Sequence, residues 1–202
     1  QLSQCRSIDE VISGLKGTIY YSPLESLRQK GQAALPACET AVDMLYFKTV
    51  WKIKEKYLSG QEKKDLTQCF GTRMDMLNLQ WICRAKKYYH LPEGEIYAMI
   101  IPISLHLKKT EIRAMAQAED VEQVYALIRN SWYGRLDLGN LEKGQSLEEP
   151  CREVIDRIYE LTSRKEPYSA SVLNSYLYFK EREIEKIITT IERIRYGVAA
   201  GI

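Results

Sequence analysis

Glycine and proline are scarce in this sequence of 202 residues, which contains 11 glycines and 6 prolines. Both residue types interrupt helices, and here they fall mostly between stretches of apolar residues with helical spacing. The sequence also has little of the alternating apolar and polar pattern that is typical of strands. That pattern occurs only briefly in residues 97–107, where Pro102 interrupts it. These absences predict an all-α protein.

An excess of charge of one sign is also missing. The chain carries 29 Lys and Arg residues against 27 Asp and Glu residues, a net charge of +2. Such a balance provides no general attraction to nucleic acid or to anionic lipid. No apolar run approaches the roughly 18 residues that a membrane-spanning helix needs, and no signal peptide is visible. We therefore predict no nucleic-acid partner and no direct insertion into a membrane.

Motifs that carry catalysis or hold metals are missing as well. The sequence contains no H-E-x-x-H, no G-x-S-x-G, no glycine-rich phosphate loop and no D-D-x-x-D. His90 and His106 have no Cys, Asp or Glu at ligand spacing, so we expect them to lie at the surface or to cap helices. The five cysteines are an odd number without a C-x-x-C pair, which is typical of reduced thiols in a cytoplasmic protein. The prediction is a protein that is not an enzyme and needs no cofactor and no metal.

The apolar spacing and the capping residues predict a succession of helices. Ser7, Asp120 and Ser146 have the character of N-caps, and both serines are followed three residues later by Glu. A polar stretch at residues 134–145 has the composition of an irregular linker. The expected helices cover residues 7–17, 23–30, 36–57, 63–89, 93–99, 107–118, 120–131, 146–164 and 169–196.

The sequence contains an internal repeat. Residues 7–11 are matched by residues 120–124 in the type of their capping, charged and apolar positions. The match continues to an aromatic residue, which is Tyr20 in the first copy and Tyr133 in the second. Agreement of a cap, an apolar stripe and a terminal aromatic residue indicates a duplicated helical unit.

A second pair of segments supports the duplication. Residues 74–88 align with residues 182–196. In this alignment four apolar residues, Cys69, Met76, Leu79 and Cys83, stand opposite Leu177, Ile184, Ile187 and Ile191. We therefore predict two repeated helical-bundle subdomains with long antiparallel helices, the first at residues 1–119 and the second at residues 120–202.

The last expected helix carries the most regular apolar pattern. Its length, about 28 residues or roughly 40 Å, exceeds that of a typical globular helix. Positions separated alternately by four and three residues are apolar with one polar interruption: Leu173, Leu177, Lys180, Ile184, Ile187, Ile191 and Ile194. This is the spacing of a coiled-coil seam, so we expect the helix to pack along one or two partner helices.

Residues 176–187 and 191–197, with the sequences YLYFKEREIEKI and IERIRYG, resemble the C-terminal signature of the C subunit of V-type and A-type ATP synthases. The eukaryotic counterpart is the d subunit of the V-ATPase. Residues 75–79, DMLNL, are similar to the same motif in the first copy. Residues 15–21, LKGTIYY, resemble the sequence found where one family repeat passes to the next. The resemblance covers nearly the whole chain, with a departure at Lys186, where the family usually has Asn.

Members of this family are longer and are built from three similar helical subdomains that form a funnel. The resemblance implies that residues 1–119 correspond to the middle subdomain and residues 120–202 to the C-terminal subdomain. The first residue is Gln rather than Met. Together with the presence of two repeats, this leads us to expect a C-terminal piece, about two thirds of a family member, without the first subdomain.

The resemblance also implies a function. In this family the protein is a non-catalytic part of the rotor, which connects the membrane proteolipid ring to the central shaft and transmits torque for ion transport coupled to ATP. The implied partners are the central shaft subunits and the proteolipid ring. The implied location is cytoplasmic and peripheral to the membrane, through the ATPase complex. The alternative is a helical scaffold or adaptor protein of unrelated function, which the residues alone also permit.

Five residues of the repeated long helices are candidates for contact with a partner: Asp75, Asn78, Arg84, Glu183 and Arg195. They lie in the segments that carry the resemblance, and none of them is assigned a catalytic role. A structural role is the other interpretation, because these positions belong to the helices that define the fold. Arg84 and Arg195 also lie in the last turns of their helices, where a cation complements the helix dipole.

Overall fold

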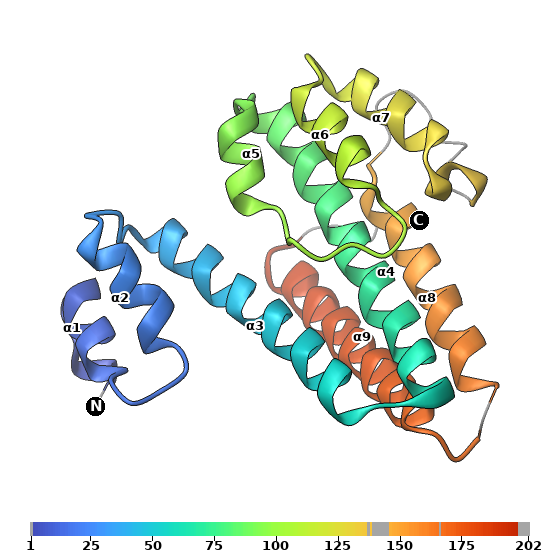
Figure 1. Cartoon of the computed structure of the whole chain (residues 1–202), viewed down its shortest axis with the longest axis horizontal. Coiled ribbons are helices and arrows are strands. Elements are labelled where there is room, and N and C mark those ends of the chain that lie inside the picture. The colour runs from blue at the N-terminus through green and yellow to red at the C-terminus, as the bar shows by residue number, and fades with distance from the viewer. Residues whose placement is uncertain (1, 137, 139–145, 166, 198–202) are drawn as a thin grey trace.

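The structure, a computed structural model, is helical throughout the residues that it describes, which are 2–136, 138, 146–165 and 167–197 (Figure 1). No strand occurs in these ranges, and the predicted all-α class is confirmed. The α-helices are α1 (Ile8–Gly14), α2 (Tyr21–Gln29), α3 (Leu35–Tyr57), α4 (Gly60–Arg84), α5 (Glu93–Met99), α6 (Lys109–Gln117), α7 (Val121–Asn130), α8 (Glu148–Ser163) and α9 (Ala170–Arg195). Short helices of other types are η1 (Leu2–Gln4), η2 (Ala85–Tyr89) and η3 (Trp132–Arg135).

Several helix ends form where local chemistry predicts them. The Ser7 side chain accepts a hydrogen bond from the backbone N–H of Glu10 at 3.2 Å, and that of Asp120 accepts one from Gln123 at 2.8 Å. Each bond satisfies a backbone N–H that the first turn of a helix leaves without an intrahelical partner. His90 has a left-handed φ of 49° and ends the π-helix η2, so the predicted capping role of this histidine is confirmed.

The start of α8 differs from the predicted capping box. The Ser146 hydroxyl accepts a hydrogen bond from the backbone N–H of Glu148 at 3.3 Å, and Leu147 occupies the N-cap position. Leu147 is buried in the core, so its packing sets the start of the helix. Part of the predicted linker, residues 137 and 139–145, lies outside the described residues.

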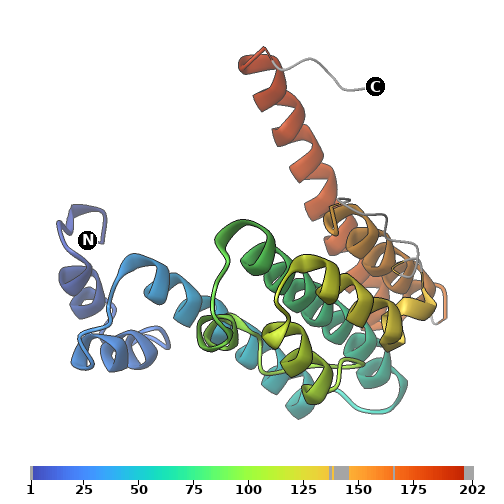
Figure 2. The ribbon, with the colours of Figure 1, turned by 90° about the horizontal axis from the view of Figure 1, so that it is seen from above.

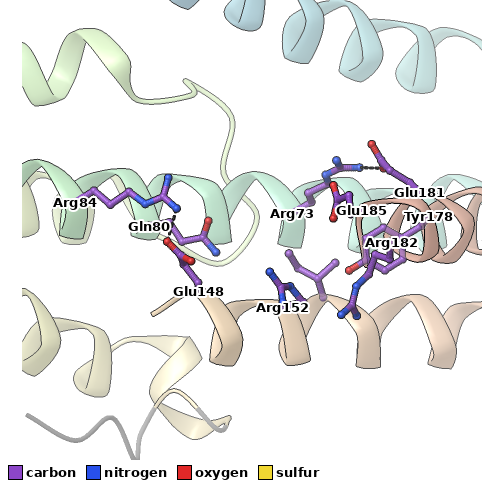
Figure 3. A pocket seen from close by; sticks show the side chains of 10 residues that line it. Arg73, Gln80, Arg84, Glu148, Arg152, Tyr178, Glu181, Arg182 and Glu185 are labelled. Atoms are coloured by element: carbon purple, nitrogen blue, oxygen red, sulfur yellow. Dashed lines mark hydrogen bonds and ion pairs between the residues drawn. The ribbon is translucent and has the colours of Figure 1, made fainter. Parts of the chain in front are cut away.

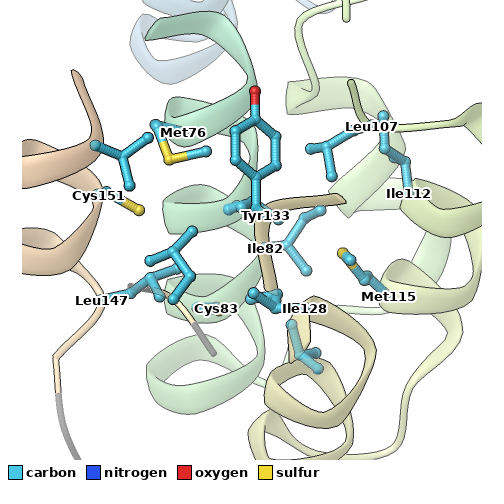
Figure 4. Packing of buried hydrophobic residues seen from close by; sticks show 14 of the residues in the cluster. Met76, Ile82, Cys83, Leu107, Ile112, Met115, Ile128, Tyr133, Leu147 and Cys151 are labelled. Atoms are coloured by element: carbon cyan, nitrogen blue, oxygen red, sulfur yellow. The ribbon is translucent and has the colours of Figure 1, made fainter. Parts of the chain in front are cut away.

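Helix α4 is the centre of the larger part of the molecule, where α8 and α9 pack along it and α5 and α7 contact it. Met76 and Ile82 of α4 are fully buried, and Figure 4 shows Met76 between Cys151 of α8 and Tyr133 of η3. The hydrophobic cluster that they belong to extends from Cys69 to Tyr178. It therefore contains residues from both of the predicted repeats.

A second, smaller hydrophobic cluster lies near the N-terminus. Ile12 of α1, Leu24 of α2 and Cys38 at the start of α3 are its buried members. Helix α3 runs from this cluster to α4, so that α1 and α2 lie beyond the far end of α3 in Figure 1. The long helix α3 is thus the connection between the two clusters.

Helix α9 packs on α4 and α8, but not through the predicted seam. Its buried residues are Ser171, Ser175 and Tyr178. Ser175 donates a hydrogen bond to the backbone oxygen of Tyr159 at 2.9 Å, and the rings of Tyr159 and Tyr178 stack with centroids 4.0 Å apart. Small serines let the two helices approach closely, which the bulky isoleucines of the seam would prevent. Within the described residues, the predicted packing face of this helix is therefore wrong.

Candidate functional site

Asp75 binds the segment between α5 and α6 from inside the protein. Its carboxylate accepts hydrogen bonds from the backbone N–H groups of Leu105 (3.2 Å), His106 (2.8 Å) and Leu107 (3.2 Å). The Tyr133 hydroxyl donates a fourth bond to the same carboxylate at 2.8 Å. Asp75 and Tyr133 are both fully buried. One side chain of α4 therefore holds a non-helical segment and η3 together.

Asn78 supports the same segment one helical turn along α4. Its side-chain amide donates to the backbone oxygen of Ile101 at 3.1 Å, and its side-chain oxygen accepts from the Ile101 N–H at 2.8 Å. Asn78 is fully buried. Both backbone groups of Ile101 thus find partners in a place where the segment has no helix or sheet to supply them.

The surroundings of Asp75 affect the proton equilibria of this cluster. Burial raises the pKa of the Asp75 carboxyl, while the four hydrogen bonds that it accepts favour its ionised form and oppose that shift. Burial and the nearby Asp75 raise the pKa of the Tyr133 hydroxyl, so Tyr133 remains a hydrogen-bond donor. The cluster stabilises the fold, and neither Asp75 nor Asn78 offers surface to a partner in this structure.

The segment between α5 and α6 packs closely against α4 at Gly71. A Cβ atom added to Gly71 would lie 2.8 Å from the Leu105 Cβ, nearer than side-chain atoms normally approach. We expect Gly71→Leu to lower the free energy of unfolding by about 2 kcal/mol, because overpacking forces the segment away from α4. Urea unfolding followed by circular dichroism measures this change. Gly94→Leu is the control, since nothing lies within 4 Å of a Cβ at that position; equal losses in the two variants would contradict the explanation.

Arg84 lies on another face of α4, away from Asp75. Its guanidinium pairs with Glu148 at the start of α8, and both side chains are about half exposed. They border a polar cleft of about 190 Å³ between α4, α8 and α9, which Figure 3 shows. Four arginines and three glutamates line it, namely Arg73, Arg84, Arg152, Arg182, Glu148, Glu181 and Glu185. Because the opposite charges nearly balance, the cleft has no strong preference for an anion or a cation.

A partly buried ionic cluster at the edge of this cleft was not predicted from the sequence. Asp156 of α8 accepts a hydrogen bond from the Tyr178 hydroxyl at 2.7 Å and forms an ion pair with Arg182 of α9. The two partners are four residues apart on α9, so they lie on one face of that helix. The sequence shows this spacing, but it does not show that Asp156 faces it. The cluster joins α8 to α9.

An apolar groove of about 690 Å³ lies between α3, α4 and α9. Tyr46 and Val50 of α3 form one wall, and Leu177 and Ile184 of α9 form the other. The side chain of Arg73 also lines the groove, and its guanidinium is 3.5 Å from Glu181. The wall residues of α9 belong to the predicted seam, so the groove continues into the exposed face of that helix.

Glu183 and Arg195 lie on the exposed part of α9, far along the chain from the Asp75 cluster. Glu183 pairs with Lys180 at 2.6 Å, and this hydrogen bond lowers the pKa of the Glu183 carboxyl. The guanidinium of Arg195 lies 5.7 Å from the centre of the Tyr196 ring. The structure therefore brings Asp75 and Asn78 together on one segment and places Arg84, Glu183 and Arg195 elsewhere at the surface.

The apolar positions that the predicted repeat aligns differ in their burial. In the first copy Cys69, Met76, Leu79 and Cys83 are at most 5% exposed. The aligned residues of α9, which are Leu177, Ile184, Ile187 and Ile191, are 53% to 59% exposed. The first stripe is covered by the helices that follow it in the chain. The second has no such cover among the described residues.

The cysteines and histidines do not form a reactive centre in the part of the chain that the structure describes, where no three metal-ligating side chains come together. Burial raises the pKa of Cys69 to about 11 and that of Cys83 to about 12, which keeps these thiols protonated and unreactive. His106 is half-buried and stacks on the Trp132 ring, with centroids 3.6 Å apart. Of the described helices, none is both long enough and apolar enough to cross a membrane.

Comparison with known proteins gives a consistent set of relatives. A family model described as ATP synthase (C/AC39) subunit matches residues 1–201. The C subunit of the A-type ATP synthase from Pyrococcus abyssi (strain GE5 / Orsay) is 26% identical, over 98% of this chain and 54% of the relative. Its counterpart from Pyrococcus horikoshii is 27% identical over 91% of this chain and 50% of the relative. The counterpart from Methanothermobacter thermautotrophicus is 24% identical over 92% of this chain and 50% of the relative. The chain spans about half the length of these curated relatives.

Proposed function

The chain belongs to the ATP synthase (C/AC39) subunit family, and on that premise we propose that it acts as a non-catalytic connector in a rotary ATPase. In this proposal it links the membrane proteolipid ring to the central shaft and transmits torque between them. The observation that carries the proposal is the family match over residues 1–201. The relatives bear the name of a subunit of A-type ATP synthase.

The packing supports a mechanical role. A part that transmits torque has to resist deformation, and long helices that share one core meet this need. Helices α4, α8 and α9 contact one another, and a single hydrophobic cluster extends from Cys69 to Tyr178. The ion pair of Asp156 with Arg182 adds a connection between α8 and α9 at the edge of that core.

The division of the chain is part of the same proposal. We propose that residues 1–119 and 120–202 are two of three related helical units of a funnel-shaped protein. Ser7 and Asp120, which begin the two copies, both act as N-caps in the same way, and this supports the repeat. The larger hydrophobic cluster joins the part of the first unit from Cys69 onward to the second unit.

The proposed contact residues fall into two groups. Arg84, Glu183 and Arg195 are at the surface, and we propose that they touch the partners directly. Asp75 and Asn78 would contribute to partner binding indirectly, because their hydrogen bonds fix the backbone of the segment between α5 and α6.

The test is capture of the protein by its proposed partners. We expect the full chain to bind both immobilised central-shaft subunits and detergent-solubilised proteolipid ring from an A-type ATP synthase. Arg84→Glu and Glu183→Lys should each weaken one of these interactions about fivefold, as expected for an exposed charge pair. Glu192→Lys is the control, since Glu192 is exposed on the side of α9 away from Glu183. If the unaltered chain captured neither partner, the connector role would be wrong and a helical adaptor of unrelated function would be favoured.

A further inference from the structure

The start of α9 carries polar side chains into its interface with α4 and α8. Figure 2 shows the later part of α9 projecting away from the rest of the molecule, so the first turns attach the helix. Ser171 and Ser175 are buried there, at 0% and 2% exposed. Ser175 donates to the backbone oxygen of Tyr159, whereas the Ser171 hydroxyl has no hydrogen-bond partner among the described residues. A buried hydroxyl without a partner is unusual in a folded protein.

Two more buried polar atoms of this interface lack a partner within the described ranges. One is the Oδ2 oxygen of Asp65 on α4, a residue that is 1% exposed. The other Asp65 oxygen, Oδ1, accepts hydrogen bonds from Gln61 at 2.9 Å and from Lys165 at 3.1 Å. The second atom is the side-chain nitrogen Nδ2 of Asn174 on α9. Buried polar atoms that no protein group satisfies are the ordinary partners of a bound polar molecule.

Contacts between the helices show how α4 and α9 are aligned. Glu62 of α4 accepts a hydrogen bond from the N–H of Ala170, the first residue of α9, at 3.0 Å. Further along, Arg73 of α4 pairs with Glu181 of α9. Both pairs are 108 residues apart in the chain, so the two helices run side by side in the same direction over this length.

This alignment brings the three unpartnered atoms together. Asp65 lies at the level of Ser171 and Asn174, which are three residues apart and therefore on one face of α9. Lys165, just after α8, reaches the same level through its bond to Asp65. The three atoms thus lie around a common space where α4, α8 and α9 meet.

The chemistry of the three atoms selects water as the bound molecule. An ionised carboxylate only accepts hydrogen bonds, an amide nitrogen only donates them, and a hydroxyl does either. A cation cannot accept from the Asn174 nitrogen, and an anion would be repelled by Asp65, whose charge Lys165 already balances. Water both donates and accepts, so it can satisfy all three atoms.

We propose that Asp65, Ser171 and Asn174 bind one ordered water molecule, which joins α4 to the start of α9. The water donates to Asp65 Oδ2, accepts from Asn174 Nδ2 and forms a hydrogen bond with the Ser171 hydroxyl. Asp65 and Ser171 are already buried by the helices of this chain. The site therefore depends neither on the connector role nor on what packs against the outer surface.

A high-resolution crystal structure of the full chain tests the site directly. We expect one water oxygen at about 3 Å from both Asp65 Oδ2 and Ser171 Oγ. A direct hydrogen bond between these two side chains, or a well-ordered site without water, would overturn the proposal.

Oxygen-17 magnetic relaxation dispersion, which detects long-lived water and no protein atom, tests the same site in solution. Ser171→Ala should shorten the residence time of the bound water about tenfold, because the water loses one of its hydrogen bonds. Ser175→Ala is the matched control at a buried serine one turn along α9, whose hydroxyl donates directly to the Tyr159 oxygen. It should leave the residence time unchanged, and circular dichroism should show that both variants keep their helix content. Equal residence times in Ser171→Ala and the unaltered chain would contradict the water site.

Discussion

Replacing Asp75 with alanine should lower the free energy of unfolding by about 4 kcal/mol, the largest loss that we expect from a single side chain in this protein. The carboxylate is fully buried and accepts from three backbone N–H groups and from the Tyr133 hydroxyl. Its removal would leave four donors without this acceptor, two of them fully buried, and a cavity beside them. Loss of the segment between α5 and α6 from α4 is the expected structural result.

The measurement is urea unfolding followed by far-ultraviolet circular dichroism at constant pH. Asp43→Ala is the control, because Asp43 is exposed on α3, and its loss should stay within about 0.5 kcal/mol. Tyr133→Phe removes one of the four donors and should cost about 2 kcal/mol, since that bond reaches a charged acceptor. In the double variant the two losses should not add, because both belong to one interaction. Additive losses would show that the Tyr133–Asp75 bond contributes nothing.

Asn78→Ala should lower the free energy of unfolding by about 3 kcal/mol. Two buried hydrogen bonds are lost, and the N–H and C=O of Ile101 are both left without their side-chain partners. Asn78→Asp keeps the acceptor for the Ile101 N–H but loses the donor to the Ile101 oxygen. Its carboxylate would then face that oxygen, so we expect a loss similar to that of Asn78→Ala.

The same unfolding experiment measures these changes, with Asn130→Ala as the control at an exposed position near the end of α7. Hydrogen exchange adds a local measurement, because the Ile101 N–H should lose its protection in Asn78→Ala while amides of α8 keep theirs at equal denaturant. A variant that retained the stability and the Ile101 protection of the unaltered chain would contradict the assigned role of Asn78.

Much of the fold could be predicted because its signals are local. The N-caps at Ser7 and Asp120, the left-handed residue at His90 and the spacing of apolar residues depend on neighbours a few positions away. A short-range pattern therefore predicts helix α5 over the residues that the structure shows, 93–99. At the start of α8 a distant contact, the packing of Leu147 in the core, sets the helix limit. The N-cap is therefore Leu147 rather than the predicted Ser146.

The candidate site could be predicted only in part. The repeat directs attention to Asp75 and Asn78 on α4, and both prove to be buried side chains with specific contacts. The sequence does not show that they face residues 101–107 or that Tyr133 completes the cluster, because those residues are more than twenty positions away. Nor does it place Arg84 beside Glu148, although each residue alone fits its helix end.

By itself the sequence determined the all-α class, most of the helix limits and, through its resemblance, the family, while the internal repeat stays a prediction. These properties follow from backbone propensity, capping and periodicity, which act over a few residues. Only the tertiary structure decided which apolar stripe is covered. Met76 of α4 is buried while its counterpart in the repeat, Ile184 of α9, is 56% exposed. The two stripes have the same apolar pattern in the sequence. Whether a stripe is buried depends on which other helices pack against it, and those contacts are long-range.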